Sequence, residues 1–414
     1  MPLANHPPKP LAPTPGSAPC RVALVFSHPV QHFVPFYRLL AQRPELQFRV
    51  FFCSRVGLDK NLDPGFGLEI SWDMDLTGGY EHEFLTGAES IRQISFRQVN
   101  NPGVERRLEE YRPDVLVVAG YSLLTTLRVI RWANRRGVPV LMISDSELLH
   151  HRALAKRVLK QLLLRPLFRR IAGFLTTGDN NRAYFRHYGV PAEKLFPCPL
   201  TIEESAYLAA RARRAELRAQ TRARLQIPDD AFVVVFVGKL IPRKRPADLL
   251  AAVAAGAAGP RVCILLVGDG ELRPALERQA TALPAAAYRF AGFINQRELP
   301  AMYAAADALA HPAEMDPHPL SINEAVLLGL PVVVSDKVGS IGPTDTVRPN
   351  MNALVHPVGD VPALAAALRR LAENPALVRE LGEGSLRVAA ETGSAASTAG
   401  FVRAAQTVVA RARG

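Results

Sequence analysis

The chain has 414 residues, 48% of them hydrophobic and 21% charged, and its 50 Lys and Arg against 38 Asp and Glu give a formal net charge of +12. This length predicts more than one domain, the apolar share excludes a wholly disordered chain, and the basic balance excludes an acidic solvating protein. The four cysteines are scattered without a CxxC, which excludes a disulfide framework and favours the cytoplasm. No apolar run approaches the roughly 20 residues of a spanning helix, and Pro-rich residues 1–20 indicate a disordered leader.

The excess positive charge lies mainly in the first half of the chain. Residues 1–200 carry 26 Lys and Arg against 17 Asp and Glu, whereas residues 201–414 carry 24 against 21. The densest segment, residues 150–170 (HHRALAKRVLKQLLLRPLFRR), holds seven cations and no acid. Helical spacing groups its cations Arg152, Lys156, Arg157 and Lys160 on one face and Leu154, Ala155, Val158, Leu159 and Leu162 on another. The segment is therefore either a packed helix with a solvated basic face or a peripheral contact with an anionic membrane, and without a recognition motif it does not indicate nucleic acid.

Short β-branched runs alternate with longer helical stretches from residue 21 onward. We expect strands over 21–26, 47–53, 114–119, 138–143 and 173–176, with a helix over 123–136. This alternation is typical of an α/β domain with a parallel, doubly wound sheet. The prediction is a Rossmann-like domain over residues 21–200.

A second series of the same kind follows. The Arg/Ala-rich stretch within 201–230 predicts a connecting helix, and the expected strands are 232–237, 261–267, 288–290, 308–311 and 331–335. We expect a helix over 364–374 to be closed by Pro375, and a C-terminal helix over 394–414 to join the first domain. A second Rossmann-like domain is thus predicted over residues 231–393.

The first chemistry-bearing segment, VGKLIPRKRP, directly follows a strand of the second domain. Gly238 permits a tight turn, and Lys239 and Lys244 bring cations to the carboxyl end of that strand, where open α/β sheets bind ligands. Clustered cations suit a diphosphate, although a basic turn is also ordinary solvated surface.

The second segment, AEMDPHPLSINEAVLLG, carries two carboxylates eight positions apart. Asp316 precedes a Pro-stiffened loop, and Glu324 follows near the start of a helix whose amides and dipole would face an anion. The two carboxylates could accept hydrogen bonds from vicinal sugar hydroxyls. The alternative is that Glu324 caps its helix and Asp316 lies in a turn.

The order of four segments is more specific than any of them alone. VGKLIPRK, LLVGDGELRPALE, FAGFINQRELPAMYAAADALAHPA and DPHPLSINEAVLLGLPVVVSDKVG follow one another within about 110 residues. Together they resemble the nucleotide-sugar-binding domain of the retaining glycosyltransferases of family 4, which have the GT-B fold. The resemblance covers Phe232 to about Glu391 well and the first domain loosely. It implies two Rossmann-like domains that face each other across a cleft.

The resemblance also implies residue roles. Lys239 and Lys244 would hold the donor diphosphate, Glu324 the ribose and Asp316 the transferred sugar, where the family has a glutamate; Lys239, Lys244 and Asp316 are thus the catalytic candidates. Between the two carboxylates, Pro319 offers no amide, which leaves His318, Leu320 and Ser321 as donor contacts together with Gly238.

The first domain departs further from the family pattern. The family's Gly-Gly loop is replaced by SHPVQHFVP, which places Ser27, His28, Gln31 and His32 at the turn. They could bind phosphate or an acceptor hydroxyl, or could form a structural turn. The family's active-site histidine is replaced by Ser144, with Asp145 and Glu147 as nearby ionisable groups. The acceptor-side candidates are therefore His28, Gln31, His32, Asp145 and Glu147.

Two further motifs indicate other chemistry only weakly. Asp73-Met74-Asp75 is a DxD, which binds metal in a different glycosyltransferase fold, but here it follows a loop and is read as part of the acceptor side with Trp72 and Tyr80. Gly268-Asp269-Gly270 lacks the third glycine of a dinucleotide fingerprint, because Arg273 occupies that position. Neither a metal site nor a dehydrogenase is predicted.

We therefore predict a retaining, metal-independent glycosyltransferase without cofactor, whose donor is a nucleoside diphosphate sugar, with UDP as the expected nucleotide. Its acceptor would be a lipid-linked, polysaccharide or other glycan in cell-surface glycan synthesis. The expected location is the cytoplasm, with peripheral membrane contact through 150–170. The alternatives are a nucleotide-sugar epimerase or hydrolase, and a binding protein without catalysis.

Overall fold

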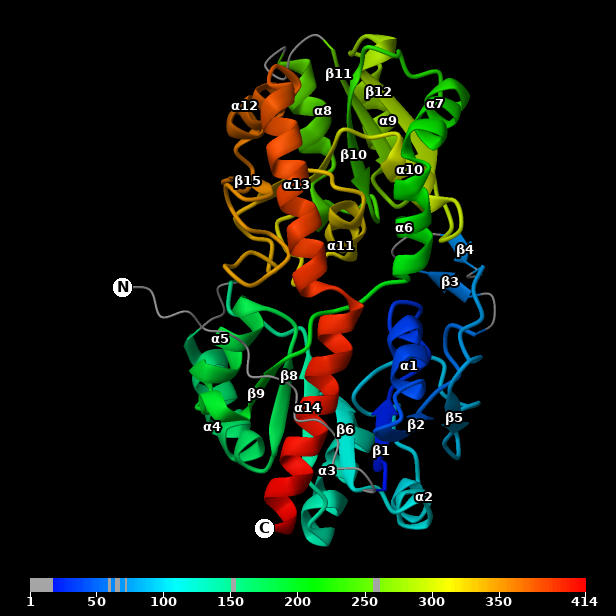
Figure 1. Cartoon of the computed structure of the whole chain (residues 1–414), viewed down its shortest axis with the longest axis vertical. Coiled ribbons are helices and arrows are strands. Elements are labelled where there is room, and N and C mark those ends of the chain that lie inside the picture. The colour runs from blue at the N-terminus through cyan, green and yellow to red at the C-terminus, as the bar shows by residue number, and fades with distance from the viewer. Residues whose placement is uncertain (1–17, 59–60, 64–67, 71–72, 150–153, 256–260) are drawn as a thin grey trace.

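The computed structural model describes residues 18–58, 61–63, 68–70, 73–149, 154–255 and 261–414. It has two α/β domains stacked along the long axis of the molecule, with the first domain below the second in Figure 1. Each domain is built on a parallel sheet with helices on both faces. The predicted fold class, two doubly wound Rossmann-like domains, is confirmed. The expected leader lies almost wholly outside the described residues.

The sheet of the first domain has seven strands in the order β5-β2-β1-β6-β7-β8-β9, all parallel. Its strands are β1 (Cys20–Phe26), β2 (Leu46–Phe52), β5 (Glu81–Phe84), β6 (Val115–Ala119), β7 (Val140–Ser144), β8 (Gly173–Thr176) and β9 (Leu195–Pro197). The short strands β3 (Asn61–Asp63) and β4 (Leu68–Ile70) form a separate antiparallel pair. The expected strands of this half agree with the structure to within two residues at either end. The strand order reverses between β1 and β6, where such sheets open a crevice.

The second sheet has six strands in the order β12-β11-β10-β13-β14-β15. They are β10 (Phe232–Val237), β11 (Val262–Val267), β12 (Tyr288–Gly292), β13 (Ala308–His311), β14 (Val332–Ser335) and β15 (Ala353–His356). The runs FVVVFV and VCILLV are buried along almost their whole length, because helices cover both faces of a parallel sheet. The carboxyl ends of β10, β11 and β13 point toward the first domain.

Helices build one apolar core on each face of each sheet. In the first domain one face carries α2 (Val104–Tyr111), α3 (Leu124–Arg136), α4 (Leu154–Arg169) and α5 (Asp179–His187), and the other carries α1 (Val34–Ala41) and α14 (Ser394–Arg413). In the second domain one face carries α6 (Glu204–Ala212), α7 (Arg214–Arg224), α10 (Leu299–Ala304) and α11 (Leu320–Leu327), and the other carries α8 (Ala247–Ala254), α9 (Arg273–Ala280), α12 (Val361–Ala372) and α13 (Pro375–Thr392).

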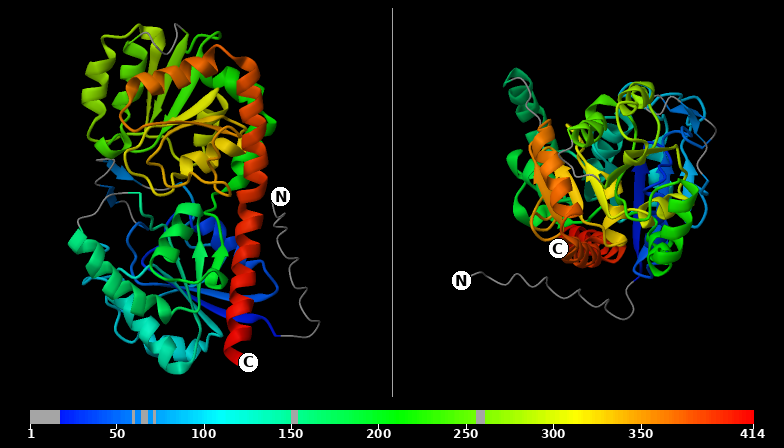
Figure 2. Two further views of the ribbon diagram at one scale, coloured as in Figure 1. Left: turned by 90° about the vertical axis from the view of Figure 1, so that its left-hand side faces the viewer. Right: turned by 90° about the horizontal axis from the view of Figure 1, so that it is seen from above.

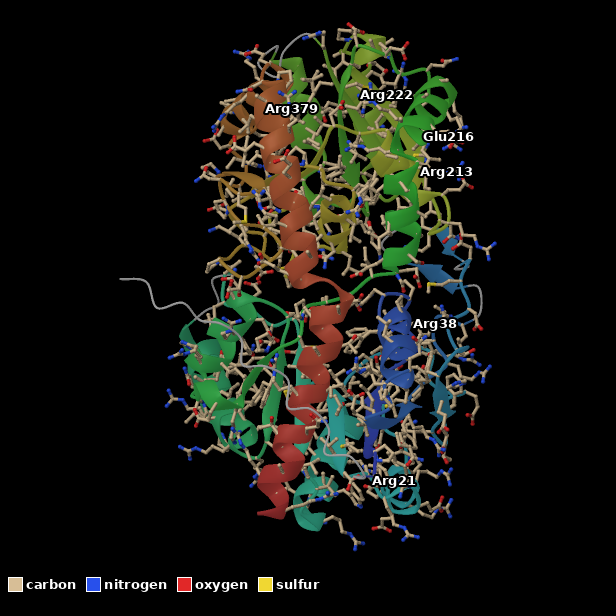
Figure 3. All side chains as sticks on the ribbon, viewed as in Figure 1. Arg21, Arg38, Arg213, Glu216, Arg222 and Arg379 are labelled. Atoms are coloured by element: carbon tan, nitrogen blue, oxygen red, sulfur yellow. The ribbon has the colours of Figure 1, made fainter. Side chains whose placement is uncertain are left out.

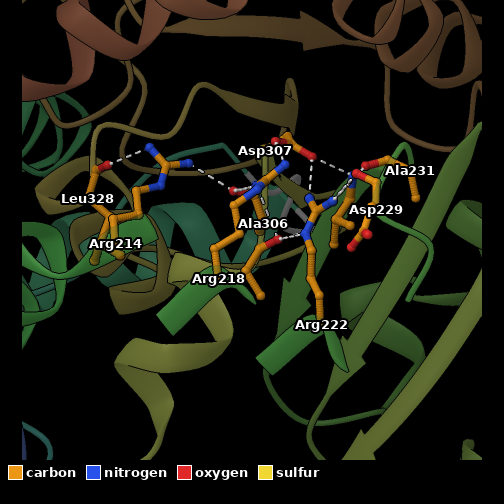
Figure 4. A network of polar contacts seen from close by, with 10 residues as sticks. Arg214, Arg218, Arg222, Asp229, Ala231, Ala306, Asp307 and Leu328 are labelled. Atoms are coloured by element: carbon orange, nitrogen blue, oxygen red, sulfur yellow. Dashed lines mark hydrogen bonds and ion pairs between the residues drawn. The ribbon is translucent and has the colours of Figure 1, made fainter. Parts of the chain in front are cut away.

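The stretch expected as one connecting helix forms two helices, α6 and α7, which pack on the second domain. Arg222 of α7 is buried and binds Asp307 at 2.8 Å as well as the carbonyls of Ala305 and Ala231, and Arg218 binds the other oxygen of Asp307 (Figure 4). By contrast, Arg213 at the start of α7 forms an exposed ion pair with Glu216 (Figure 3). Arg222 and Arg218 thus fix α7 to the amino ends of β10 and β13, in the middle of the second sheet.

The chain returns to the first domain through its last two helices, α13 and α14, which lie end to end along one side of both domains (Figure 2). The chain passes between the domains here and again before α6, and Glu204 ties the two crossings together by accepting hydrogen bonds from the amide and hydroxyl of Ser394. Helix α14 packs closely on β9, because a Cβ on Gly400 would lie 1.9 Å from the carbonyl oxygen of Pro197. The expected role of Pro375 is wrong in part: α12 does end before it, but Pro375 also begins α13.

The domains also touch across the cleft, on the side of α5. The carboxylate of Asp345 accepts the Asp179 amide at 2.9 Å, and Asp179 in turn accepts the Thr344 amide at 2.7 Å. The side-chain amide of Asn180 donates to the carbonyls of Gly339 and Ile341. These bonds hold the N-terminus of α5 against the loop that follows β14.

Candidate active site between the domains

The predicted donor residues meet in one cavity of about 310 Å³ at the carboxyl ends of the second-domain strands. Its lining includes every residue predicted for donor binding: Gly238, Lys239, Lys244, Asp316, His318, Leu320, Ser321 and Glu324. Gln31 of the first domain also lines it, so the cavity lies between the two domains. The donor residues, which extend over 86 positions of the chain from Gly238 to Glu324, are thereby brought together.

Glycine makes the floor of this cavity possible. Gly238 and Gly268 follow β10 and β11 with φ of 149° and 139°, values that side-chain-bearing residues rarely adopt. A Cβ on Gly268 would lie 1.9 Å from the Gly238 carbonyl oxygen. The motif Gly268-Asp269-Gly270 therefore serves close packing of two strand ends, and Asp269 pairs with Arg273 at 2.5 Å.

Lys244, Asp316 and His311 form a buried polar cluster at one end of the cavity. The ammonium of Lys244 binds Oδ2 of Asp316, and Nε2 of His311 lies 2.8 Å from the same oxygen. Burial alone would raise the pKa of Asp316, but the His311 hydrogen bond and the Lys244 charge hold it well below its ordinary value. Asp316 is therefore an ionised carboxylate that orients Lys244, not a simple turn residue.

Glu324 is buried at the opposite side of the cavity. Glu324 is the fifth residue of α11, and the N-cap residue of this helix is Pro319. The alternative that Glu324 caps its helix is therefore wrong. The Tyr303 hydroxyl donates to its Oε2. Burial nevertheless raises the pKa of Glu324 to about 7, because the charged form is poorly solvated there. A buried carboxylate of this kind gains most from a ligand that brings hydroxyl donors.

The first domain contributes the opposite wall. Gln31 and His32 line a cavity of about 370 Å³ that also contains Glu324, and His32 lines a further cavity of about 510 Å³ with Ser144 and Asp145. The Ser144 hydroxyl is buried without a hydrogen-bond partner among the described residues. His32 thus lies where the donor side and the first-domain cavity adjoin.

The other acceptor-side candidates are placed differently. His28 accepts or donates a 2.9 Å hydrogen bond with the Ser27 hydroxyl and lines none of the cavities named here. Glu147 accepts the Leu149 amide at 2.6 Å, as in a local turn. The sequence predicted five acceptor-side residues. The structure places three of them, Gln31, His32 and Asp145, at the cleft.

The DxD motif also lies at this cleft. Asp73, Met74 and Asp75 line the 370 Å³ cavity, and the Asp73 carboxylate accepts the Arg297 amide at 3.2 Å across the domain gap. Asp75 instead accepts the amides of Thr77 and Gly78, which is a structural role. Within the described part of the chain, no three His, Cys, Asp or Glu side chains are grouped as a metal site requires. Trp72 lies outside the described residues, and buried Tyr80 donates to the Leu76 carbonyl.

The basic segment differs from one of the two expectations, that of a helix whose apolar face is packed on the domain. The side chains of residues 150–158 lie outside the described ones, but Leu159, Leu162 and Leu163 of α4 are 57%, 68% and 62% exposed, so an apolar face packed on the domain is wrong for this part of α4. Lys160 points inward and donates to the Tyr184 hydroxyl at 3.1 Å. No helix among the residues placed by the structure is both long and apolar enough to cross a membrane.

Two site residues were not predicted, His311 and Tyr303. Each contacts a predicted carboxylate, Asp316 or Glu324. His311 ends a buried strand, and a polar residue at the carboxyl end of a parallel strand is the signal that could have identified it. Tyr303 lies on α10, and nothing in its helical pattern separates it from a core residue.

Two family models match this chain. The model "Glycosyl transferases group 1" matches residues 218–387, and the model "Glycosyl transferase 4-like domain" matches residues 71–201. A GDP-mannose-dependent alpha-mannosyltransferase of Mycobacterium tuberculosis is 29% identical over 268 residues, 62% of this chain and 63% of that protein. A D-inositol 3-phosphate glycosyltransferase of Streptomyces coelicolor is 31% identical over 241 residues, 55% of this chain and 51% of that protein. The chain thus spans between about half and two thirds of the length of these relatives.

Solved structures share the whole architecture. Anabaena HepE in complex with UDP and glucose superposes with a TM-score of 0.67 at 17% identity, covering 94% of this chain and 100% of that one. Sucrose-phosphate synthase of Thermosynechococcus elongatus superposes with a TM-score of 0.66 at 20% identity, covering 95% and 100%. Both domains, their order and the cleft between them therefore follow one known fold, and with the two matching models this chain belongs to the GT-B glycosyltransferases of family 4 type.

Proposed function

We propose that the protein is a retaining glycosyltransferase that moves a sugar from a nucleoside diphosphate sugar to a glycan or lipid-linked acceptor. The observation that carries this proposal is the 310 Å³ cavity, in which two lysines and two carboxylates from separate segments converge beside a wall from the first domain. Cations for a diphosphate and carboxylates for sugar hydroxyls are the groups that such a donor requires. The nucleoside diphosphate sugar is a substrate, and the proposal includes no metal or cofactor.

On the donor side, Lys239 and Lys244 would stabilise the charge that develops on the departing diphosphate. Asp316 would orient Lys244 and accept a hydroxyl of the transferred sugar, since its carboxylate stays ionised. Glu324 would accept hydrogen bonds from the ribose hydroxyls. These bonds would stabilise its charged form, which burial leaves poorly solvated. In a retaining reaction the leaving phosphate itself takes the proton of the acceptor hydroxyl.

On the acceptor side, the 510 Å³ cavity of the first domain offers Asp145, Ser144 and His32 at its wall. The exposed leucines of α4 support an acceptor that is embedded in a membrane, because contiguous exposed apolar side chains beside cations suit an anionic lipid surface. Lys160 lines the cavity and lies next to Leu159 on the same helix. The proposed location is the cytoplasmic face of the membrane, bound peripherally.

The donor proposal is tested in two steps. Thermal shift against UDP, GDP, ADP and dTDP identifies the nucleotide, because a ligand that binds the native state raises the melting temperature. Transfer from the matching nucleotide sugars to glycan and lipid-linked acceptors is then measured, and NMR of the product reports the anomeric configuration. Release of free sugar or its isomer with no acceptor dependence would indicate a hydrolase or epimerase, and nucleotide binding without turnover a binding protein. An inverted product would show that a carboxylate such as Asp145 acts as general base and would refute retention.

The membrane proposal is tested by vesicle sedimentation with anionic and neutral lipid. The triple variant Leu159→Ser, Leu162→Ser and Leu163→Ser should lose binding to anionic vesicles. Leu208→Ser is the matched control, because Leu208 is 40% exposed but belongs to the second domain. Equal binding of the triple variant and the control would contradict this surface.

A further inference from the structure

Two histidines, one from each domain, lie near enough to interact electrostatically where the cleft would receive a diphosphate. His32, from the loop after β1, lines the 370 Å³ and 510 Å³ cavities, and His318, from the loop before α11, lines the 310 Å³ cavity with Lys239 and Lys244. Gln31, next to His32, lines two of these cavities and joins them. The Nε2 atom of His318 is buried without a hydrogen-bond partner among the described residues.

The backbone offers this position few donors. Helix α11 begins after Pro319, which has no amide hydrogen, so the N-terminus of this helix lacks one of the N–H groups that usually bind a phosphate. The turn after β1 presents the side chains of SHPVQH instead of a bare glycine backbone. Imidazole N–H groups are therefore among the donors that the two loops supply at the cleft, together with the side chains of Gln31 and Ser321.

We propose that His32 and His318 bind the diphosphate of the donor, His32 as an imidazolium group and His318 through its buried Nε2, so that the nucleotide sugar and a proton bind together. This inference rests on the proposed function, because it assumes that Lys239 and Lys244 mark the diphosphate position. A charged imidazolium donates from both ring nitrogens and makes charge-assisted hydrogen bonds to phosphate oxygens, which neutral imidazole makes less well.

The surroundings of His32 determine whether donor binding takes up or releases a proton there. Burial, together with the nearby His28 and His318, lowers the pKa of His32 to about 4, so that its ring is neutral in the empty cleft. A phosphate anion placed beside the ring of His32 reverses the balance and raises the pKa of His32.

Charged groups from both domains surround this position. Besides Glu324, those that share a cavity with His32 are Arg38, Asp73, Asp75, Glu203, Arg297, Asp145 and Lys160. The 310 Å³ cavity adds Lys239, Arg243 and Lys244, of which Lys244 is paired with Asp316, and Asp345 lies near His318. Glu324 acts in the opposite sense: if ribose hydroxyls favour its ionised form, binding would release a proton from it. The two contributions can therefore be separated by their sign and by replacing Glu324.

The test is titration calorimetry of the whole protein with UDP-glucose and GDP-mannose at pH 7, in two buffers of different ionisation enthalpy. Both phosphates of these probes are esterified and do not titrate near neutral pH, so any proton uptake belongs to the protein. We expect the net proton uptake to be larger in Glu324→Gln than in the wild type. For each proton taken up, the affinity for the nucleotide sugar should rise by up to about tenfold when the pH falls by one unit between pH 8 and 6. His32→Gln should reduce the uptake and flatten this pH dependence, and His318→Gln should weaken binding because it removes a donor to the diphosphate.

His187→Gln is the matched control, because His187 is an exposed histidine on α5 that binds Gln161 away from the cleft. Melting curves without ligand check that each variant folds, and His318→Asn provides a second variant if His318→Gln does not. Nucleotide-sugar binding with no proton uptake, with uptake that persists in His32→Gln, or with unchanged affinity in His318→Gln would overturn this inference and leave the proposed function standing. If the wild-type protein bound neither probe nor any of the four nucleotides, the donor site itself would be wrong and both proposals would fall.

Discussion

Replacing Glu324 by glutamine should stabilise the protein above neutral pH. In the folded chain burial raises the pKa of this carboxyl from its ordinary value of 4.5 to about 7. The folded state then binds more protons than the unfolded state between these two values, so the contribution of Glu324 to stability is fully present below pH 4.5 and is lost as the pH rises through 7. The loss amounts to roughly 3 kcal/mol, since a tenfold change in a proton-binding constant is worth about 1.4 kcal/mol.

Glutamine has nearly the same shape, can accept the Tyr303 hydroxyl and carries no charge to bury. The difference in unfolding free energy between Glu324→Gln and the wild type should therefore grow by roughly 3 kcal/mol from pH 4.5 to pH 8, measured by urea denaturation followed by circular dichroism. Glu314→Gln is the control, because Glu314 lies on the loop before α11 and its side chain is 62% exposed. The same variant should raise the KM for the donor, since ribose hydroxyls are held in ground and transition states alike. A pH-independent difference would refute the reasoning.

Three further predictions concern the donor site and the second domain. Lys244→Ala should lower kcat by about 10²–10³, since it removes a charge from the leaving diphosphate, whereas Arg245→Ala should change it little because Arg245 is bound to Asp248; steady-state kinetics compares the two. Asp316→Asn should lower kcat more than it raises KM, because Lys244 loses the carboxylate that orients it, and equal kinetics to wild type would contradict this role. Arg222→Met should lower the free energy of unfolding, measured by urea denaturation, by about 2–4 kcal/mol, because buried carbonyls lose their hydrogen-bond donor. An equal cost for Arg213→Met, which removes only an exposed pair, would contradict that reason.

Much of the fold could be predicted from the sequence because most of its strands are local signals. The predicted strands are mostly continuous apolar runs, whereas β5 (EHEF) and β9 (LFP) carry no such signal and were not predicted. Lys239 follows a strand end, where parallel sheets bind ligands. The assignment of Lys239 and Glu324 to one donor site came from the resemblance to the family.

The pairing within the site could not be predicted in the same way. Lys244 and Asp316 are 72 residues apart, and whether they bind each other or only a ligand depends on packing at the ångström level. The exposure of Leu159 and Leu162 was equally hidden, since an amphipathic pattern shows which residues share a face but not what covers that face. The helices α6 and α7 were expected to connect the domains, but two of the partners of Arg222, Ala305 and Asp307, lie more than 80 residues later, in the turn between α10 and β13.

The route of the chain through α14 has a consequence for synthesis. Phe401 is fully buried and packs against the rings of Phe36 and Phe48, so the core on one face of the first sheet includes residues from the end of the chain. Between Pro197 and Ser394 the ribosome makes the whole second domain, which at 5–20 residues per second takes about 10–40 s. During that time the part of this apolar face that α14 covers in the folded protein is exposed, although α1 can already pack on the same face. We therefore expect the first domain to complete this core only after α14 has left the ribosome.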